Sequence, residues 1–271
     1  MTLEEAIKIL NDAGVDSPSY DAEALFCHFG GYSRSTLYLM HAIESDDPRL
    51  LAAIERRAKR EPLQYIIGEV GFYRESYKVT PDCLIPRSDT ETLVDYAVKH
   101  IPEGERFIDL CTGSGCIAIS TLYNTKNTTA IAVDISEGAL KVAAENAKKN
   151  GVANRIDLRR ADLMNEVIEE KVFAILSNPP YVTESAYRSL EGEIYHEPMG
   201  AFVGGEDGLD FYRRFTPIYK NYIAKSGFIA YEIGYDQAEM LKAIADECSM
   251  SCQIIKDLSG NDRVAVLKNI N

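Results

Sequence analysis

The chain has 271 residues and a net charge of −13, and 46% of its residues are hydrophobic, which suits one large folded domain or two of unequal size. The acidic charge argues against broad DNA binding, which needs basic residues to neutralise phosphates, and no run reaches the roughly 18 apolar residues of a membrane span. With no signal-peptide pattern, Cys-x-x-Cys pair or metal-type His and Cys spacing, we expect a cytoplasmic protein with reduced thiols, no metal and no membrane or direct DNA partner.

Helical spacing dominates residues 1–63. Apolar residues at positions 3, 6, 7 and 10 share one helix face, and Gly14 ends that helix. Further helices are expected over 21–29, 33–41 and 48–60, before Pro62 ends the series, so we predict a small helical bundle. The basic residues at 56, 57, 59 and 60 are interpreted as a solvated helix face rather than a nucleic-acid patch.

Residues 64–87 change in character. They are rich in aromatic and β-branched residues, beginning with Tyr65, Ile66 and Ile67, and turn residues separate the runs. We predict a β-hairpin over 64–87 that links two domains. A helix over 90–99 follows, with Ser88 or Asp89 as its N-cap.

Strands and helices alternate in the remainder of the chain, over residues 88–271. Strands are expected at 107–110, 130–133, 156–158, 172–176, 228–231, 251–255 and 264–267, and helices at 116–122, 138–149, 208–224 and 235–247. Repeated βαβ units predict an α/β domain with a mostly parallel sheet. The last two strands have no helix between them and predict an antiparallel C-terminal hairpin.

A glycine loop lies between the first strand and the first helix of this domain. It begins at Asp109 and continues through Cys111, Thr112, Gly113, Ser114 and Gly115. A nicotinamide fingerprint would place glycines at 111 and 116, where this chain has cysteines. The spacing Asp-x-x-x-Gly-x-Gly suits S-adenosylmethionine, whose methionine ammonium needs a nearby carboxylate or carbonyl. S-adenosylhomocysteine would be the product.

Acidic residues follow the next two strands. Asp134 can bind both ribose hydroxyls, while Asp162 and Leu163 can meet the adenine amino group and ring. Each residue alone could be an ordinary turn or cap. Three acidic positions at successive strand ends, in register with the loop, favour a cofactor site.

The sequence Asn178-Pro179-Pro180-Tyr181 directly follows the fourth strand of the α/β region. The Asn178 side-chain oxygen and a proline carbonyl can accept two hydrogen bonds from one NH₂ group, and Tyr181 offers a ring to a planar group. Both a primary amide and an adenine amino group pose this recognition problem. The alternative, a simple strand-end turn, is weakened by the glycine loop upstream.

Several stretches resemble the release factor glutamine methyltransferases. They lie at 61–68, 71–73, 84–87, 109–115, 178–181, 204–210, 232–234 and 260–264, so the resemblance spans the whole chain. It implies a Rossmann-like S-adenosylmethionine-dependent methyltransferase domain behind a substrate-recognition domain. It further implies methylation of the glutamine amide in the Gly-Gly-Gln motif of peptide chain release factors, by a protein that we expect to be a monomer. Asn178 to Tyr181 would bind the amide, and Phe72 would wall the pocket beside the methyl donor.

The chain departs from the family at two places. Cys111 stands where the family usually has glycine, which is tolerable if residue 111 keeps a negative φ, and Ser88-Asp89 replaces Pro-Glu. Arg87, Glu91 and Glu197 either surround the mouth of the active site, with Glu197 ordering a substrate loop, or form surface ion pairs. Two other substrates stay open: a glutamine of a ribosomal large-subunit protein, and the adenine amino group of DNA or RNA.

Overall fold

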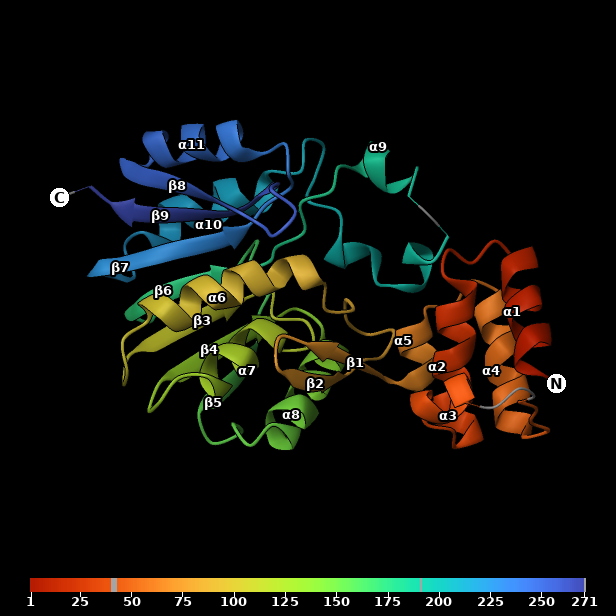
Figure 1. Cartoon of the computed structure of the whole chain (residues 1–271). Helices are drawn as coiled ribbons and strands as arrows, with labels where there is room; N and C mark the ends of the chain where they lie inside the picture. The colour runs from red at the N-terminus through yellow and green to blue at the C-terminus, as the bar shows by residue number, and fades with distance from the viewer. Residues whose placement is uncertain (40–42, 191, 271) are drawn as a thin grey trace. The chain divides into compact units, whose positions relative to one another are not determined.

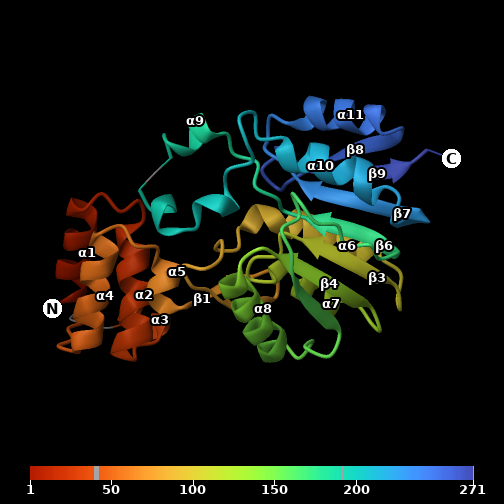
Figure 2. The ribbon, with the colours of Figure 1, turned by 180° about the vertical axis from the view of Figure 1, so that it is seen from behind.

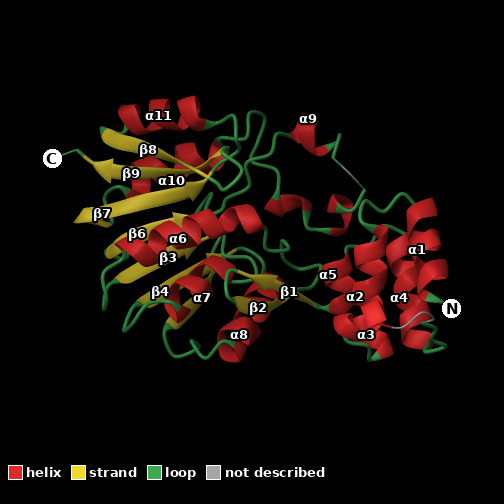
Figure 3. Ribbon diagram, viewed as in Figure 1, coloured by secondary structure: helices red, strands yellow, loops and turns green. Residues whose placement is uncertain are grey.

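The computed structural model describes residues 1–39, 43–190 and 192–270. The chain divides into two compact units (Figure 1). One comprises Met1–Glu69 with Glu191–His196, and the other comprises Val70–Leu190 with Glu197–Asn271. Coloured by secondary structure, the first unit is helical and the second contains the large sheet (Figure 3). None of the described helices is both long enough and apolar enough to cross a membrane.

Helices build the first unit, as its sequence predicts. They are α1 (Leu3–Asp12), α2 (Pro18–Gly30), α3 (Arg34–Leu39), α4 (Pro48–Ala58) and α5 (Leu63–Ile67), with the short 3-10 helix η2 (Ile194–His196). A capping box starts α1, because the side chains of Thr2 and Glu5 each bond the other's backbone N–H. Apolar faces of the five α-helices meet in one core. Positions 40–41 of the expected helix over 33–41 lie outside the described residues.

The prediction of a strand through Tyr65, Ile66 and Ile67 is wrong, because these residues form α5. Pro62 precedes this helix, and Gly68 ends it in the left-handed conformation with φ 81°. A single turn of helix places Leu63 and Ile66 three residues apart on one face, and both join the helical core. The need to cover that core outweighs the intrinsic β preference of these side chains.

The interpretation of the basic stretch as a solvated face is wrong for Arg57, which is 4% exposed. It lies seven residues after Leu50, on the buried face of α4. Its guanidinium donates to Asp21 and to Glu193, each at 2.6 Å. Burial raises the pKa of Asp21, and the charge and hydrogen bond of Arg57 counter that rise.

The second unit begins with a hairpin and continues as an α/β domain. Its helices are η1 (Ser88–Thr90), α6 (Glu91–His100), α7 (Cys116–Tyr123), α8 (Glu137–Lys149), α9 (Glu184–Tyr187), η3 (Met199–Ala201), α10 (Asp210–Tyr219) and α11 (Ala238–Glu247). Its strands are β1 (Glu69–Phe72), β2 (Glu75–Lys78), β3 (Arg106–Leu110), β4 (Thr129–Asp134), β5 (Ile156–Arg160), β6 (Val172–Ser177), β7 (Ile223–Glu232), β8 (Met250–Lys256) and β9 (Asp262–Asn269). The alternation predicted from residue 106 onward is confirmed.

The sheet has seven strands in the order β5-β4-β3-β6-β7-β9-β8. Neighbouring strands from β5 to β7 are parallel, and β9 pairs antiparallel with both β7 and β8. Helices α6 and α7 pack on one face and α10 and α11 on the other, as the two opposite views show (Figures 1 and 2). The mostly parallel sheet with an antiparallel C-terminal hairpin is therefore confirmed. Strand order reverses between β3 and β6, and ligands of open α/β sheets bind at such a switch point.

The expected N-cap of α6 is wrong. Ser88 and Asp89 belong to the 3-10 turn η1, and no side chain caps α6. The carboxylate of Asp89 instead lies 3.2 Å from the guanidinium of Arg263, which belongs to β9. A tertiary ion pair thus replaces the local cap that the sequence suggested.

Candidate methyl-transfer site

The loop between β3 and α7 uses its two glycines differently. Gly115 has φ 82°, and a Cβ there would lie 2.8 Å from Ile119 and 3.1 Å from Ala143, so glycine lets α7 pack closely. Gly113 has φ 54°, and a Cβ there would meet nothing within 4 Å. The open space over Gly113 belongs to a cavity, so the backbone can approach a ligand at this position.

Cys111 adopts φ 60°, so the condition of a negative φ, under which cysteine would replace glycine here without strain, is not met. The reason lies in the contacts on either side of Cys111. Leu110 ends the buried strand before it, and Thr112 after it donates its backbone N–H to the carbonyl of Val133 on the neighbouring strand at 2.9 Å. The chain must turn within one residue, which favours the left-handed region. For a residue with a Cβ this conformation costs about 1–2 kcal/mol. Burial also raises the pKa of the Cys111 thiol, which keeps it protonated.

Two carboxylates hold this loop from opposite sides. Asp134 accepts the backbone N–H of Gly113 at 2.8 Å and that of Ser136 at 2.9 Å, one on each oxygen. Asp109 is fully buried, and its Oδ2 accepts from Thr112 at 2.6 Å and from the Ala118 N–H at 3.2 Å. Burial raises the pKa of Asp109 to about 7, against the lowering effect of these two hydrogen bonds.

Asp109 also has an unused oxygen. Its buried Oδ1 has no hydrogen-bond partner among the described residues. A buried carboxylate oxygen left in this state is costly, and a cationic or donor group of a ligand is one way to satisfy it. Asp162, after β5, is held locally instead: Met164 donates its N–H at 3.1 Å and Asn165 its side-chain amide at 2.7 Å.

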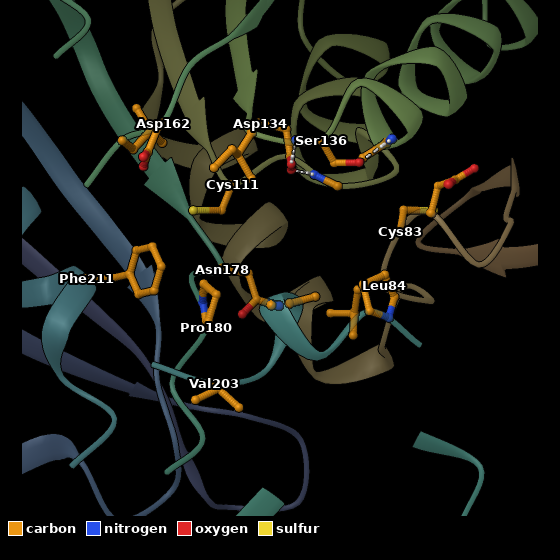
Figure 4. A pocket seen from close by; sticks show the side chains of 18 of the residues that line it. Cys83, Leu84, Cys111, Asp134, Ser136, Asp162, Asn178, Pro180, Val203 and Phe211 are labelled. Atoms are coloured by element: carbon orange, nitrogen blue, oxygen red, sulfur yellow. Dashed lines mark hydrogen bonds between the residues drawn. The ribbon is translucent and has the colours of Figure 1, made fainter. Parts of the chain in front are cut away.

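A cavity of about 420 Å³ lies at the carboxyl ends of β3, β4 and β6 (Figure 4). Seven of the residues expected at the site line it: Cys111, Gly113, Asp134, Asp162, Leu163, Asn178 and Pro180. The other expected residues are absent from its lining: Phe72, Asp109, Thr112, Ser114, Gly115, Pro179, Tyr181 and Glu197. Sequence reasoning missed several apolar residues of the wall, among them Leu84, Ile135, Val203 and Phe211. Ile135 could have been found, because an apolar residue follows the strand-end carboxylate at the predicted ligand edge.

Asn178 follows β6 directly and points into the cavity (Figure 4). Its side-chain Nδ2 donates to the hydroxyl of Thr90 at 3.3 Å. That bond uses the donor end of the amide, so the acceptor end, Oδ1, can serve a ligand.

The backbone after Asn178 is held by the segment over residues 202–208. Val182 donates its N–H to Phe202 at 2.8 Å, and Gly204 donates its own to Val182 at 2.9 Å. A Cβ at Gly204 would collide with the carbonyl oxygen of Pro180, and one at Gly208 with that of Tyr181. Only glycine permits this approach, so the glycines at 204 and 208 fix the shape of the proline turn.

Tyr181 lies behind the turn. Its hydroxyl donates to Glu232 at 3.1 Å, its carbonyl accepts from Gln237 at 3.1 Å, and its ring packs on the core that α10 and α11 cover. The structure therefore gives Tyr181 a supporting position, while its expected contact with a planar group stays a prediction. The ring of Phe211 lines the cavity instead (Figure 4).

Three other residues expected near the mouth make contacts within the second unit. Glu197 is 6% exposed, and its carboxylate accepts the Ile85 N–H at 2.9 Å and forms an ion pair with Arg87. Glu91 accepts the N–H of Tyr73 at 2.9 Å, which ties α6 to the hairpin. From the sequence, Glu197 is expected either to order a substrate loop or to form a surface ion pair. Its contacts are compatible with the first role, since it directly precedes Pro198, which lines the cavity.

Phe72 is buried in the hairpin, where its ring packs edge-on against Tyr77 with centroids 5.8 Å apart. It belongs to the core that α6 and α7 cover. A wall role for Phe72 beside a methyl donor therefore stays a prediction.

Comparison with known proteins extends over the whole chain. A family model described as "PrmC N-terminal domain" matches residues 2–68, and one described as "Methyltransferase small domain" matches residues 89–197. The release factor glutamine methyltransferase of Thermodesulfovibrio yellowstonii is 40% identical over 257 residues, covering 92% of this chain and 91% of that protein. The protein of the same name from Moorella thermoacetica is 37% identical over 269 residues, covering 96% and 95%.

A solved structure supports the fold. The ribosomal protein L11 methylase of Lactobacillus delbrueckii subsp. bulgaricus superimposes with a TM-score of 0.52 at 19% identity, covering 71% of this chain and 84% of that one. At this level of identity the likeness concerns the fold alone. It confirms the α/β fold predicted for this domain.

Proposed function

The chain belongs to the release factor glutamine methyltransferases, and on this premise we propose that it methylates the glutamine of the Gly-Gly-Gln motif in peptide chain release factors. The enzyme is a protein-(glutamine-N5) methyltransferase, and its donor is of the S-adenosylmethionine type. The observation that carries the substrate is the similarity along nearly the whole length, the helical N-terminal part included. A shared methyltransferase domain alone would leave the substrate open.

S-adenosylmethionine fits the cavity. Its ribose hydroxyls suit Asp134, because a carboxylate offers about four lone-pair sites and the backbone N–H groups of Gly113 and Ser136 take one on each oxygen. Its adenine suits Ile135 and Leu163, which are apolar residues of the wall, with Asp162 beside them. The open space over Gly113 suits the methionine end, and Asp109, which does not itself line the cavity, holds this loop through Thr112. When bound, this donor supplies an electrophilic methyl group.

Asn178 and a proline carbonyl act on the nitrogen that receives the methyl group. The Asn178 oxygen and the Pro179 or Pro180 carbonyl each accept one N–H of the glutamine amide, which aims the nitrogen at the methyl carbon. An amide nitrogen is a weak nucleophile because its lone pair is delocalised. The two acceptors stabilise the positive charge that develops on its hydrogens as the new bond forms. The extra proton then leaves to a carbonyl or to water, so no strong base is needed.

We further propose that the helical domain over residues 1–63 binds the release factor, and that residues 88–271 carry out the transfer. The buried ion pairs of Arg57 with Asp21 and Glu193 support a defined shape for the helical unit. A preorganised helical unit can bind a protein substrate at a distance from the reacting amide and loses little conformational entropy in doing so.

A direct assay tests the proposed substrate. The full chain is incubated with methyl-labelled S-adenosylmethionine and either unmethylated release factor, ribosomes or DNA, and the label is located by peptide mass spectrometry. We expect label on the Gly-Gly-Gln glutamine of the release factor. Label on a ribosomal protein or on adenine, with an untouched release factor, would overturn the proposal. A release factor whose Gly-Gly-Gln glutamine is replaced by glutamate is the matched substrate control.

A further inference from the structure

Thr90 lies behind the substrate end of the cavity without lining it. It is the last residue of η1, immediately before α6, and it is 2% exposed. Its hydroxyl oxygen accepts the Asn178 Nδ2 at 3.3 Å, across 88 residues of sequence. Asn178 is thus held from behind by one buried hydroxyl.

Glu232 lies on the other side of Thr90. It ends β7 and is 1% exposed, and its Oε1 accepts the Tyr181 hydroxyl at 3.1 Å. Its Oε2 makes no hydrogen bond of ordinary geometry among the described residues. Burial raises the pKa of Glu232 to about 7, against a lowering effect of the Thr90 hydroxyl.

The direction of these bonds decides which end of the Asn178 amide faces the substrate. A hydroxyl has one hydrogen, so if Thr90 donates to Glu232 it can only accept from Asn178. Asn178 must then turn its NH₂ group toward Thr90 and its oxygen toward the cavity. The reverse orientation would aim an NH₂ group at the NH₂ group of the substrate, and no hydrogen bond could form.

We propose that Thr90 is a positioning residue: by accepting the Asn178 Nδ2, its hydroxyl fixes the Asn178 amide with its oxygen toward the substrate. The inference rests on the proposed role of Asn178 as an acceptor for the glutamine amide. It adds to that role a reason for the orientation of the amide, which the Asn-Pro-Pro-Tyr sequence does not contain.

The test compares Thr90→Val, which keeps the size of the side chain and removes the hydroxyl, with Thr90→Ser, which keeps the hydroxyl. Thr92→Val, on α6 and away from the cavity, is the matched control. Single-turnover methylation of release factor is measured at saturating donor, together with the dissociation constant for S-adenosylmethionine. We expect Thr90→Val to slow transfer by about tenfold to a hundredfold while donor affinity stays within about threefold. Thr90→Ser and Thr92→Val should remain near the wild-type rate.

A double variant separates positioning from general structure. If Thr90 acts through Asn178, Thr90→Val should cause no further loss in the Asn178→Ala background. An equal loss in both backgrounds, or a wild-type rate for Thr90→Val, would overturn the inference. The proposed function would fail differently, since the wild-type protein would then leave the release factor unlabelled or Asn178→Ala would transfer at the normal rate.

Discussion

The two ends of the cavity are built in different ways. At the donor end, the carboxylates are held mostly by residues nearby in the chain: the partners of Asp109 lie 3 and 9 residues away, those of Asp162 lie 2 and 3 away, and those of Asp134 lie 2 and 21 away. At the substrate end, Asn178 is held by a residue 88 positions away, and Tyr181 by residues 51 and 56 positions away. The donor end thus depends on contacts over at most 21 residues of sequence, while the side chains of the acceptor end are positioned by segments more than 50 residues away.

This difference predicts that donor binding and methyl transfer respond to different substitutions. Asn178→Ala removes an acceptor that acts on the substrate nitrogen and leaves the donor end intact. We expect the single-turnover rate to fall by about a hundredfold to a thousandfold, with the donor dissociation constant within about threefold. Asn221→Ala is the control, because the Asn221 side-chain amide donates to the carbonyls of Pro217 and Ile218 in its own helical segment. A near-normal rate would show that the amide is bound elsewhere.

Asp134→Ala should have the opposite effect, and weaken donor binding more than it slows methyl transfer. The variant loses a charged acceptor for two ribose hydroxyls, so the donor dissociation constant should rise about tenfold to a hundredfold. At saturating donor, the transfer rate should fall much less than in Asn178→Ala. Titration calorimetry checks the affinity, with Asp157→Ala on the exposed part of β5 as control. An unchanged affinity would contradict the placement of the ribose.

Gly204→Ala tests the long-range support of the substrate end. The new Cβ collides with the Pro180 carbonyl, so the turn must shift, which should cost about 1–3 kcal/mol of folding stability. Transfer should slow more than donor affinity weakens, because the displaced group belongs to the acceptor. Gly71→Ala, where a Cβ would meet nothing within 4 Å, is the matched control. Equal effects of the two variants on rate and melting temperature would refute the argument.

A smaller effect is expected at the donor loop. Cys111→Gly removes the strain of the left-handed backbone but increases the conformational entropy of the unfolded chain. We therefore expect the free energy of unfolding to rise by a net amount of about 0.5–1 kcal/mol. This corresponds to roughly 2 °C in melting temperature for a domain of this size. Cys111→Ala keeps the strained φ and should show no gain. Calorimetry of the two variants decides, and a lower melting temperature for Cys111→Gly would count against the strain.

The last prediction concerns pH. Burial raises the pKa of Glu232 from 4.5 to about 7, so the folded protein holds a proton that the unfolded chain releases. Stability from this group is therefore lost as pH rises from about 4.5 to 7. Glutamine does not titrate, so Glu232→Gln lacks this loss of stability. The difference between its melting temperature and that of the wild type should therefore shift in favour of the variant as pH rises from about 4.5 to 7. Asp109, whose pKa is also raised, is present in both proteins and cancels. The same difference in melting temperature between the two proteins at every pH would exclude the effect.

Much of the architecture follows from local pattern. Buried strands such as β3 and β4 show as apolar runs, and the turn glycines 113 and 115 mark the loop between strand and helix. The pattern fails where tertiary burial outweighs local preference. Residues 65–67 have strand-like side chains and fold as a helix, because Leu63 and Ile66 must cover the helical core.

By itself, the sequence determined the α/β class, the glycine loop, the strand-end carboxylates Asp134 and Asp162, and the position of Asn178 after β6. These features depend on residues close together in the chain, so periodicity and spacing report them. Only the tertiary structure decided the left-handed φ of Cys111, the placing of Phe211 in the cavity wall and of Tyr181 behind it, and the support of Asn178 by Thr90. Each of these depends on contacts between segments that are distant in sequence and meet only when the sheet forms. No local pattern specifies which distant residue will make the contact.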